Sequence, residues 1–194
     1  MQRVFLLVLI VVAAVAACRP PVPRAISDEM AATPRGQATV VFFTDFECPY
    51  CRRTHAALAP LVNERKGLVR VVLKHVPLRR HPDARTAARA AICVEALTPD
   101  NAAAYAHALM TANDLSEHAC AELAAREPGI DREAFERCTR DTSTEARIEK
   151  DTALFDEVNG DGVPLLFVGR ARLEGAQTRD SLEEALDDAI RSEK

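Results

Sequence analysis

Two cysteines separated by two residues carry the clearest chemistry in this sequence. They form the motif Cys48-Pro49-Tyr50-Cys51, which stands where a β-branched and aromatic segment gives way to a helical pattern. A Cys-X-X-Cys pair at a helix start brings its sulfurs within bridging reach. The free N–H groups and the positive end of the helix dipole then stabilise a thiolate on the first cysteine. We therefore predict thiol–disulfide exchange through a mixed disulfide, with Cys48 as the exposed nucleophile and Cys51 as the buried resolving thiol.

Three other readings of this cysteine pair stay open at this point. A haem-attachment site needs His directly after the second cysteine, but Arg52 stands there. A zinc site needs two further ligands, and although His55 lies on the same helical face as Cys51, no fourth ligand is evident. An inert structural disulfide is the plainest alternative. We expect no metal and no cofactor.

The remaining cysteines of the folded part suggest a structural cross-link. Cys120 and Cys138 flank the Pro128-Gly129 turn at equal distances, so an antiparallel helix pair would bring them side by side. We predict a Cys120–Cys138 disulfide, which would add about 3 kcal/mol to stability. Two buried free thiols are the alternative. Cys93 follows apolar residues and is expected in the core, although it could take one partner of the pair.

The cysteine motif requires a strand before it and a helix after it, and the sequence supplies both. Residues 38–44 predict a buried strand, 49–66 a helix and 68–73 a second strand. Strand, helix and strand within this length make a βαβ unit, so the two strands should be parallel.

The middle of the chain is alanine-rich and helical, and its end returns to strand. Helices are expected at 82–97, 99–113, 116–127, 131–140 and 143–158. The last part predicts a strand at 165–168, a turn at Gly169-Arg170, an edge strand at 171–174 and an amphipathic helix at 181–190.

A proline opens the strand at 165–168. Gly162-Val163-Pro164 makes a glycine-containing turn directly before that strand. A proline at such a place is a candidate for a cis peptide bond, and a trans proline that ends the preceding helix is the alternative.

The first residues are expected to direct the chain to its destination rather than to fold. Arg3 precedes an apolar run, Val4–Ala17, which is short for a membrane span and fits a signal peptide at 1–17. Small residues before Cys18 resemble the lipobox of bacterial lipoproteins, in which this cysteine is lipidated; an ordinary signal peptide is the alternative. Residues 18–36 are proline-rich and predict an extended tether, or simply a frayed end.

Composition excludes several other classes of protein. The 194 residues are 48% hydrophobic and 28% charged, as in ordinary globular proteins. The net charge of -4 offers no basic surface for nucleic acid. Aromatic residues make up 5% and Trp is absent, which argues against a base-stacking surface.

Three segments together resemble the DsbA-like branch of the thioredoxin superfamily. Residues 41–51 look like its active-site run, 162–177 like its cis-proline loop and last hairpin, and 75–84 like the run before its helical insert. Glutaredoxins share Cys-Pro-Tyr-Cys but place the cis-proline much sooner. The resemblance covers about 37–192 and implies an α/β protein, a thioredoxin fold with an inserted α-helical domain. The domain would be 37–194, with the insert at about 82–158.

The resemblance also implies roles for individual residues. Cys48, Cys51 and Pro164 would be catalytic, and Pro49, Tyr50 and Val163 would contact substrate. One departure concerns the buried acid that many relatives carry six residues before the first cysteine, where this chain has Phe42. Proton transfer at Cys51 must then use another group or water; Asp45, Glu47 and His55 are nearby in sequence.

The function expected from these features is that of an exported thiol:disulfide oxidoreductase, most simply a dithiol oxidase. Its partners would be cysteine-containing exported proteins and an unidentified redox partner that resets the pair. We expect a monomer in the cell envelope or periplasm, in contact with the membrane only through a lipid anchor. A reductase or isomerase of the same fold, or a non-enzymatic peptide-binding module, is the alternative.

Overall fold

The sheet of this protein combines one parallel and two antiparallel strand pairings. The computed structural model describes residues 22–192, so the predicted signal segment and Cys18 lie outside the described residues. The strands are β1 (Ala38–Thr44), β2 (Val69–His75), β3 (Leu165–Val168) and β4 (Ala171–Glu174), in the order β2-β1-β3-β4. β1 pairs parallel with β2 and antiparallel with β3, and β3 pairs antiparallel with β4. The βαβ unit predicted around the cysteine motif is confirmed.

Helices flank the sheet and fill the stretch between β2 and β3. They are α2 (Arg24–Met30), α3 (Pro49–Glu64), α4 (Ala84–Leu97), the short 3-10 helix η1 (Pro99–Asn101), α5 (Ala102–Thr111), α6 (Glu117–Ala124), α7 (Arg132–Arg140), α8 (Thr142–Glu157) and α9 (Arg179–Ser192). Each predicted helix is present, with ends that differ by a few residues. Along residues 22–192, no helix is both long and apolar enough to cross a bilayer.

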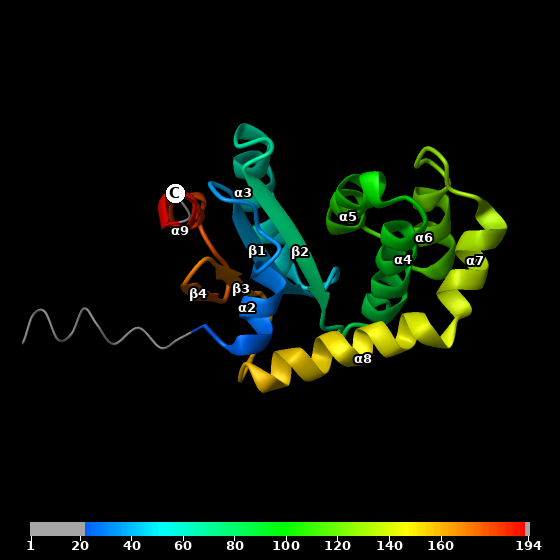
Figure 1. The fold of residues 1–194 in the computed structure, drawn as a ribbon. Helices are drawn as coiled ribbons and strands as arrows, with labels where there is room; N and C mark the ends of the chain where they lie inside the picture. The colour runs from blue at the N-terminus through cyan, green and yellow to red at the C-terminus, as the bar shows by residue number, and fades with distance from the viewer. Residues whose placement is uncertain (1–21, 193–194) are drawn as a thin grey trace, which may run out of the picture.

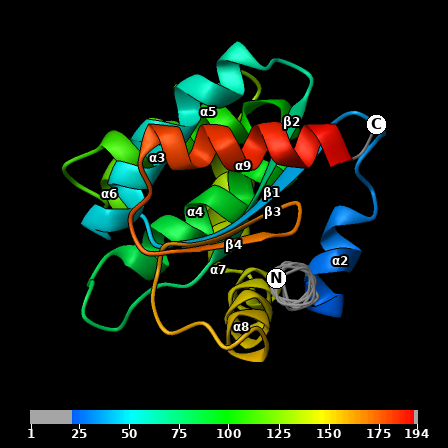
Figure 2. The same ribbon diagram turned by 90° about the vertical axis from the view of Figure 1, so that its left-hand side faces the viewer.

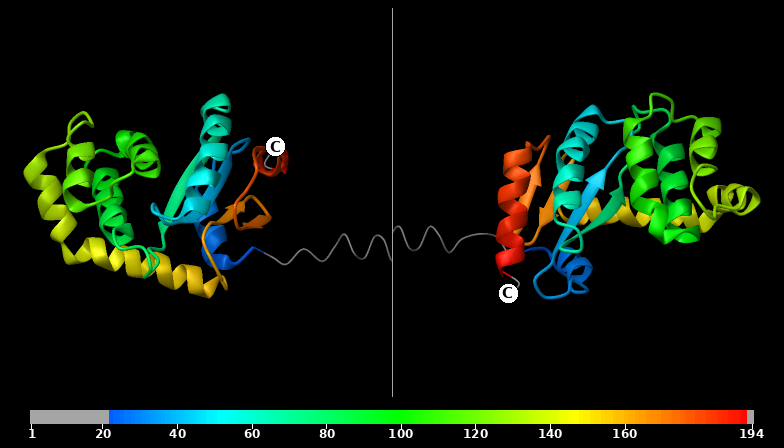
Figure 3. Two further views of the ribbon diagram at one scale, coloured as in Figure 1. Left: turned by 180° about the vertical axis from the view of Figure 1, so that it is seen from behind. Right: turned by 90° about the horizontal axis from the view of Figure 1, so that it is seen from above.

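The helices divide into a set around the sheet and a set beside it. Figure 1 shows α4 to α7 grouped beyond β2, with the long α8 running back beneath the sheet. In Figure 2, α9 lies on one side of β3 and β4, and α8 lies on the other. Both views of Figure 3 show the helical insert as a separate lobe beside the sheet. This is a thioredoxin fold with an inserted helical domain, as predicted.

Each part has its own apolar core. β1 is buried along its whole length because it is a central strand with helices on both faces. Phe43 on β1 packs against Phe155 of α8 and Phe167 of β3, with ring centroids 5.6 and 6.3 Å away. In the insert, Tyr105 and Phe135 belong to a second cluster of buried residues. Two cores explain why the insert stands as a lobe, and Leu73 of β2 packs against both.

Part of the predicted tether is a packed helix. Residues 24–30 form α2, whose Ile26 is fully buried in the main core. Glu29 holds the helix to β2, because its carboxylate pairs with Lys74 and its carbonyl accepts a hydrogen bond from Arg70 at 2.6 Å. The density of prolines around this segment had suggested an extended chain, but Pro23 stands just outside the helix and does not interrupt it.

The predicted Cys120–Cys138 disulfide is wrong. Cys138 of α7 is bonded to Cys93 of α4, and Cys120 of α6 is a buried free thiol. α4 packs against both α6 and α7, so the partner that Cys138 meets comes from α4. The Cys120 thiol instead donates a hydrogen bond to the Leu115 carbonyl at 3.3 Å. Symmetric spacing about a turn could not reveal a third helix packed against both.

Candidate active site

The junction between β1 and α3 places both cysteines of the motif at one helix start. Cys48 is the N-cap residue of α3 and has an extended backbone, and Pro49 is the first helical residue. Proline suits that position because it has no N–H to satisfy and its φ is already helical. Cys51 follows within the first turn and faces the core. The helix start therefore orients both cysteines.

Cys48 is the acidic thiol of the pair. Its pKa is lowered from 9.0 to about 6, chiefly by a hydrogen bond from the Cys51 side chain. The main-chain N–H groups of Cys51 and Tyr50 lower this pKa further, whereas burial and the Asp45 carboxylate raise it. A thiol with a pKa near 6 is mostly ionised at neutral pH, and the thiolate is the form that attacks a disulfide.

Cys51 is shifted in the opposite direction. Burial raises the pKa of the Cys51 thiol far above its ordinary value of 9.0, and the hydrogen bond with Cys48 raises it further. The Thr44 hydroxyl opposes part of this rise in pKa. Two cysteines one helical turn apart thus differ strongly in acidity. The Cys51 thiol is buried and donates a hydrogen bond, and the Cys48 sulfur accepts it.

Cys48 is buried, contrary to the prediction that it would be exposed. Its exposed fraction is 0%, as is that of Cys51. The Cys48 Sγ lies 3.7 Å from the carbonyl oxygen of Val163, in the loop before β3. This loop is distant in sequence, so the strand–helix junction alone could not show that it packs against the sulfur.

The loop before β3 carries the cis-proline predicted from the sequence. The Val163–Pro164 peptide bond is cis, and both residues are buried. The Pro164 carbonyl accepts a hydrogen bond from Gly175 N–H at 2.9 Å, which connects the loop to the end of β4. On α3, the Thr54 hydroxyl accepts a hydrogen bond from Gln177 N–H at 3.0 Å. The sheet thus brings Val163 and Pro164 to the cysteine pair.

Pro49 and Tyr50 form the exposed rim of the site. Both side chains are exposed, and Tyr50 is one of the few large hydrophobic residues so exposed among residues 22–192, at 51%. The Arg53 guanidinium lies 4.7 Å from the centre of the Tyr50 ring. An exposed aromatic ring beside a buried reactive sulfur offers a contact surface for an incoming chain.

Asp45 and His81 belong to the site. The sequence indicated Asp45 only as an acid near the cysteines and gave His81 no role there. Asp45 is 2% exposed, and its carboxylate contacts both the Cys48 main chain and the His81 ring. Phe42, at the position where many relatives have an acid, is buried in the apolar core. Asp45 was visible in sequence as an acid three residues before Cys48, but its burial depends on the loop between β2 and α4.

Two buried polar atoms lie at the paired ends of β1 and β2. Thr44 and His75 are in register, so their side chains share one face of the sheet. Thr44 Oγ1 and His75 Nδ1 have no hydrogen-bond partner among the protein atoms of residues 22–192. Burial lowers the pKa of His75 from 6.5 to about 4. The Thr44 hydroxyl is therefore available to the neighbouring Cys51.

His55 faces the insert rather than a metal. Its Nε2 lies 3.0 Å from Nδ1 of His107 on α5. Burial lowers the pKa of His55 to about 4, and the charge of His107 lowers it further. No group of three or more His, Cys, Asp or Glu side chains suited to a metal gathers in the described part of the chain.

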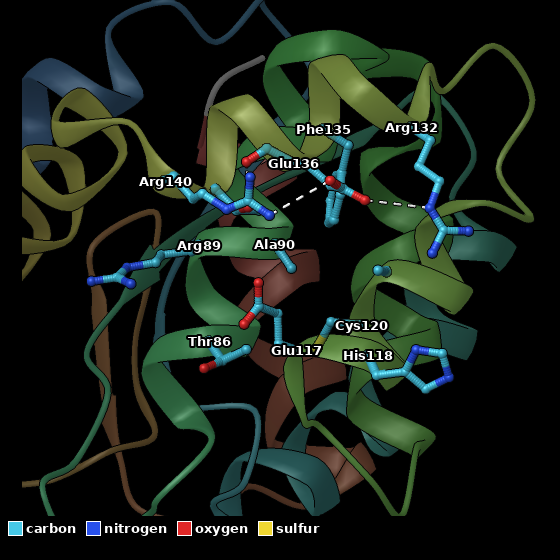
Figure 4. Close-up of a pocket in the computed structure, with 12 residues that line it drawn as sticks. Thr86, Arg89, Ala90, Glu117, His118, Cys120, Arg132, Phe135, Glu136 and Arg140 are labelled. Atoms are coloured by element: carbon cyan, nitrogen blue, oxygen red, sulfur yellow. Dashed lines mark hydrogen bonds and ion pairs between the residues drawn. The ribbon is translucent and has the colours of Figure 1, made fainter.

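A separate cavity lies inside the insert. It measures about 570 Å³ and lies between α4, α6 and α7 (Figure 4). Its basic side chains pair with acids: Arg132 and Arg140 contact Glu136, and Arg89 contacts Glu145. Of the predicted site residues, only Cys120 lines it.

Comparisons with known proteins agree with this architecture. The family model described as Thioredoxin matches residues 32–188. A thioredoxin-like oxidoreductase from Silicibacter pomeroyi DSS-3 is 31% identical, with a TM-score of 0.69 over 82% of this chain and 90% of that one. The thiol-disulfide exchange protein alpha-DsbA2 from Wolbachia pipientis is 20% identical, with a TM-score of 0.72 over 85% of this chain and 92% of that one. BdbD from Bacillus subtilis is 21% identical, with a TM-score of 0.69 over 79% and 88%.

A curated relative is much longer than this chain. Na(+)/H(+) antiporter NhaA 3 of Salinispora tropica is 33% identical over 157 residues, which are 79% of this chain and 23% of the antiporter. The chain thus spans about a quarter of that relative's length. The extent of the family match, on the fold described above, shows that the chain belongs to the thioredoxin family.

Proposed function

We propose that this protein is an exported thiol:disulfide oxidoreductase that exchanges disulfides with cysteines of other envelope proteins through Cys48 and Cys51. The observation that carries the proposal is the opposed acidity of the two thiols, with the pKa of Cys48 lowered to about 6 and that of Cys51 raised. In a pair of this kind, the acidic sulfur can act as the nucleophile and the leaving group of a mixed disulfide, and the buried thiol can act as the resolving group. The direction we propose is oxidation of substrate dithiols.

The reaction starts from the Cys48–Cys51 disulfide and a substrate with two thiols. A substrate thiolate attacks Cys48 Sγ, the bond between Cys48 and Cys51 breaks, and Cys51 leaves as a thiolate and takes up a proton. The second substrate thiolate then attacks the substrate sulfur of the mixed disulfide and releases Cys48 as a thiolate. Two electrons pass from the substrate to the pair, and an unidentified redox partner must remove them.

The acidity of Cys48 supports the oxidising direction. A thiolate of low pKa is a good leaving group in the last step, and its stability favours the reduced form of the pair. The stronger this stabilisation, the stronger the oxidant that the disulfide form makes. A reductase would have a less stabilised thiolate.

Substrate binding is proposed for the loop and the rim around the sulfur. The main chain of Val163, whose carbonyl lies 3.7 Å from Cys48 Sγ, would pair with an extended peptide. Pro164 would shape that loop, and Pro49 and the exposed Tyr50 ring would contact side chains of the peptide. Since Cys48 is buried, binding must move some of the atoms that cover it.

The proposal is tested by oxidation of a reduced, unfolded protein with two cysteines. We expect Cys48→Ser and Cys51→Ser both to abolish turnover, since neither can form the Cys48–Cys51 disulfide. With a substrate that already carries a disulfide, the Cys48 thiolate of Cys51→Ser should attack that bond and stop at a trapped mixed disulfide. Cys120→Ser is the matched control, because it removes a buried thiol of the insert and should leave turnover unchanged. Turnover that survives in Cys48→Ser would refute exchange through Cys48, and a wild-type protein that binds the substrate without turnover would favour a peptide-binding module.

Export and anchoring form a separate part of the proposal. We propose that residues 1–17 direct export and that Cys18 carries a lipid, as the small residues before this cysteine suggest. Labelling with radioactive palmitate should mark the full-length protein in the membrane fraction, and Cys18→Ser should lose the label. An unlabelled wild-type protein would favour an ordinary signal peptide.

A further inference from the structure

We propose that Asp45 is the positioning residue of the Cys48 nucleophile and that it links the active-site loop to the entrance of the helical insert. The inference rests on the proposed exchange chemistry at Cys48. Asp45 stands directly after β1 and three residues before Cys48. Its side chain is fully buried, and a carboxylate is stable there only if hydrogen bonds replace its water.

One carboxylate oxygen of Asp45 holds the active-site loop. Oδ1 accepts hydrogen bonds from the main-chain N–H of Glu47 at 2.7 Å and of Cys48 at 3.2 Å. The Cys48 N–H also reaches the Asp45 carbonyl at 3.2 Å. These bonds set the backbone of the N-cap residue, and with it the direction in which the Cys48 sulfur points toward Val163.

The other oxygen reaches the loop between β2 and α4. Oδ2 accepts hydrogen bonds from Leu78 N–H and from Nδ1 of His81, both at 2.8 Å. Asp45 thus receives four hydrogen bonds, about as many as a carboxylate can accept. Since these four hydrogen bonds occupy both carboxylate oxygens, Asp45 is suited to hold the loop.

Neighbouring residues make the same connection from either side of Cys48. Glu47 Oε2 accepts a hydrogen bond at 2.8 Å from Asp83 N–H, at the start of α4. Arg52 donates to the Phe46 carbonyl at 2.6 Å and to the Ala112 carbonyl, at the end of α5, at 2.7 Å. The loop that presents Cys48 is therefore fixed by the insert as well as by the sheet, with Asp45 at the centre of the contacts.

The charge of Asp45 has an effect that a purely structural residue would lack. It raises the pKa of Cys48, against the hydrogen bonds that lower it. Asp45→Asn keeps one oxygen for the two loop N–H groups but removes the charge and offers an amide to donors at Leu78 and His81. His81→Ala keeps the charge of Asp45 and removes the hydrogen bond that the His81 ring donates to it. The two variants therefore separate the effect of the Asp45 charge from that of the contact with the insert.

The test measures alkylation of Cys48 and its exchange with a peptide disulfide across pH, in the intact protein. For Asp45→Asn we expect the midpoint of the alkylation profile to fall by about half a pH unit. Its exchange rate at the high-pH plateau should fall at least about tenfold, since misplaced reacting groups cost about that much or more. His81→Ala should lower the plateau about threefold or more and leave the midpoint in place.

Asp131→Asn is the matched control, because Asp131 accepts a main-chain N–H from Ala134 at the start of α7. This variant should have the wild-type midpoint of the alkylation profile and the wild-type plateau of the exchange rate. Asp45→Asn with a wild-type midpoint and plateau would overturn the proposal. If that variant does not fold, an unchanged plateau in His81→Ala overturns the link to the insert. Exchange that persists in Cys48→Ser would instead refute the proposed function.

Discussion

At the scale of single residues, the two cysteines show how one helix turn creates two different thiols. Cys48 follows the extended segment after β1, and its sulfur accepts hydrogen bonds that lower its pKa. Cys51 donates a hydrogen bond to Cys48, and this bond and its burial raise its pKa. The motif alone predicts which sulfur is more acidic, because only the first lies at the helix start. It does not predict the burial of Cys48, which depends on Val163 far along the chain.

The Thr44 hydroxyl gives a residue-scale prediction. It favours the ionised form of Cys51 and has no hydrogen-bond partner among the described residues, so it is free to donate to the Cys51 thiolate once that forms. Thr44→Val should therefore raise the pKa of Cys51 further. A lost hydrogen bond to a charged group costs about 1.5–3 kcal/mol, so attack of Cys51 on a Cys48 mixed disulfide should slow about tenfold or more.

The measurement is the single-turnover release of a chromophoric thiol from Cys48. Thr44→Ser keeps a hydroxyl at the same strand position and serves as the control. Equal release rates in Thr44→Val and Thr44→Ser would show that the hydroxyl plays no part in resolution.

At the scale of elements, the disulfide of the insert joins the first helix of that lobe to a later one. Cys93 on α4 and Cys138 on α7 are 45 residues apart in sequence. A cross-link closing a loop of this length should stabilise the fold by about 4 kcal/mol in the chain-entropy view. We expect Cys93→Ala with Cys138→Ala to lose about 2–4 kcal/mol in urea unfolding.

Cys120→Ala is the control for this prediction, since it removes a thiol from the same apolar cluster and no cross-link. Its stability under non-reducing conditions should exceed that of the double variant. Peptide mapping of the oxidised protein should find Cys93 joined to Cys138. A peptide containing Cys120 joined to Cys138 would contradict this pairing.

The elements also show how far sequence reasoning reaches. Strands β1, β3 and β4 lie where the apolar and β-branched runs predicted them, because local pattern and burial agree there. The helix α2 was predicted to be part of a tether, and the disulfide was assigned to the wrong pair. Each depends on a partner distant in sequence, which is Lys74 for Glu29 and Cys93 of α4 for Cys138. The cysteine motif and the cis-proline could be named in advance, whereas the contact between Asp45 and His81 could not.

At the scale of the whole molecule, one buried and one partly buried histidine make stability depend on pH. Burial lowers the pKa of both His55 and His75 from 6.5 to about 4. Between these values the unfolded chain binds protons that the folded chain does not, so stability is complete above pH 6.5 and falls as the pH drops toward 4. Each histidine should lower the free energy of unfolding by about 2–3 kcal/mol as the pH falls through that window.

Urea unfolding at several pH values between 7.5 and 4 measures this dependence. Replacement of His55 by Phe should make the decline shallower, because one of the two proton-binding groups is gone. Stability that is flat or rises as the pH falls through this window would contradict the assignment of both histidines as neutral in the folded protein.

We expect an acidic Cys48 to make the pair a dithiol oxidant. The reduction potential of Cys48–Cys51, measured by equilibrium with glutathione, distinguishes an oxidant from a reductase. We expect a potential near that of the oxidant DsbA, about -120 mV, since stabilising the Cys48 thiolate stabilises the reduced pair. A potential near that of thioredoxin, about -270 mV, would contradict this expectation and make the protein a reductase.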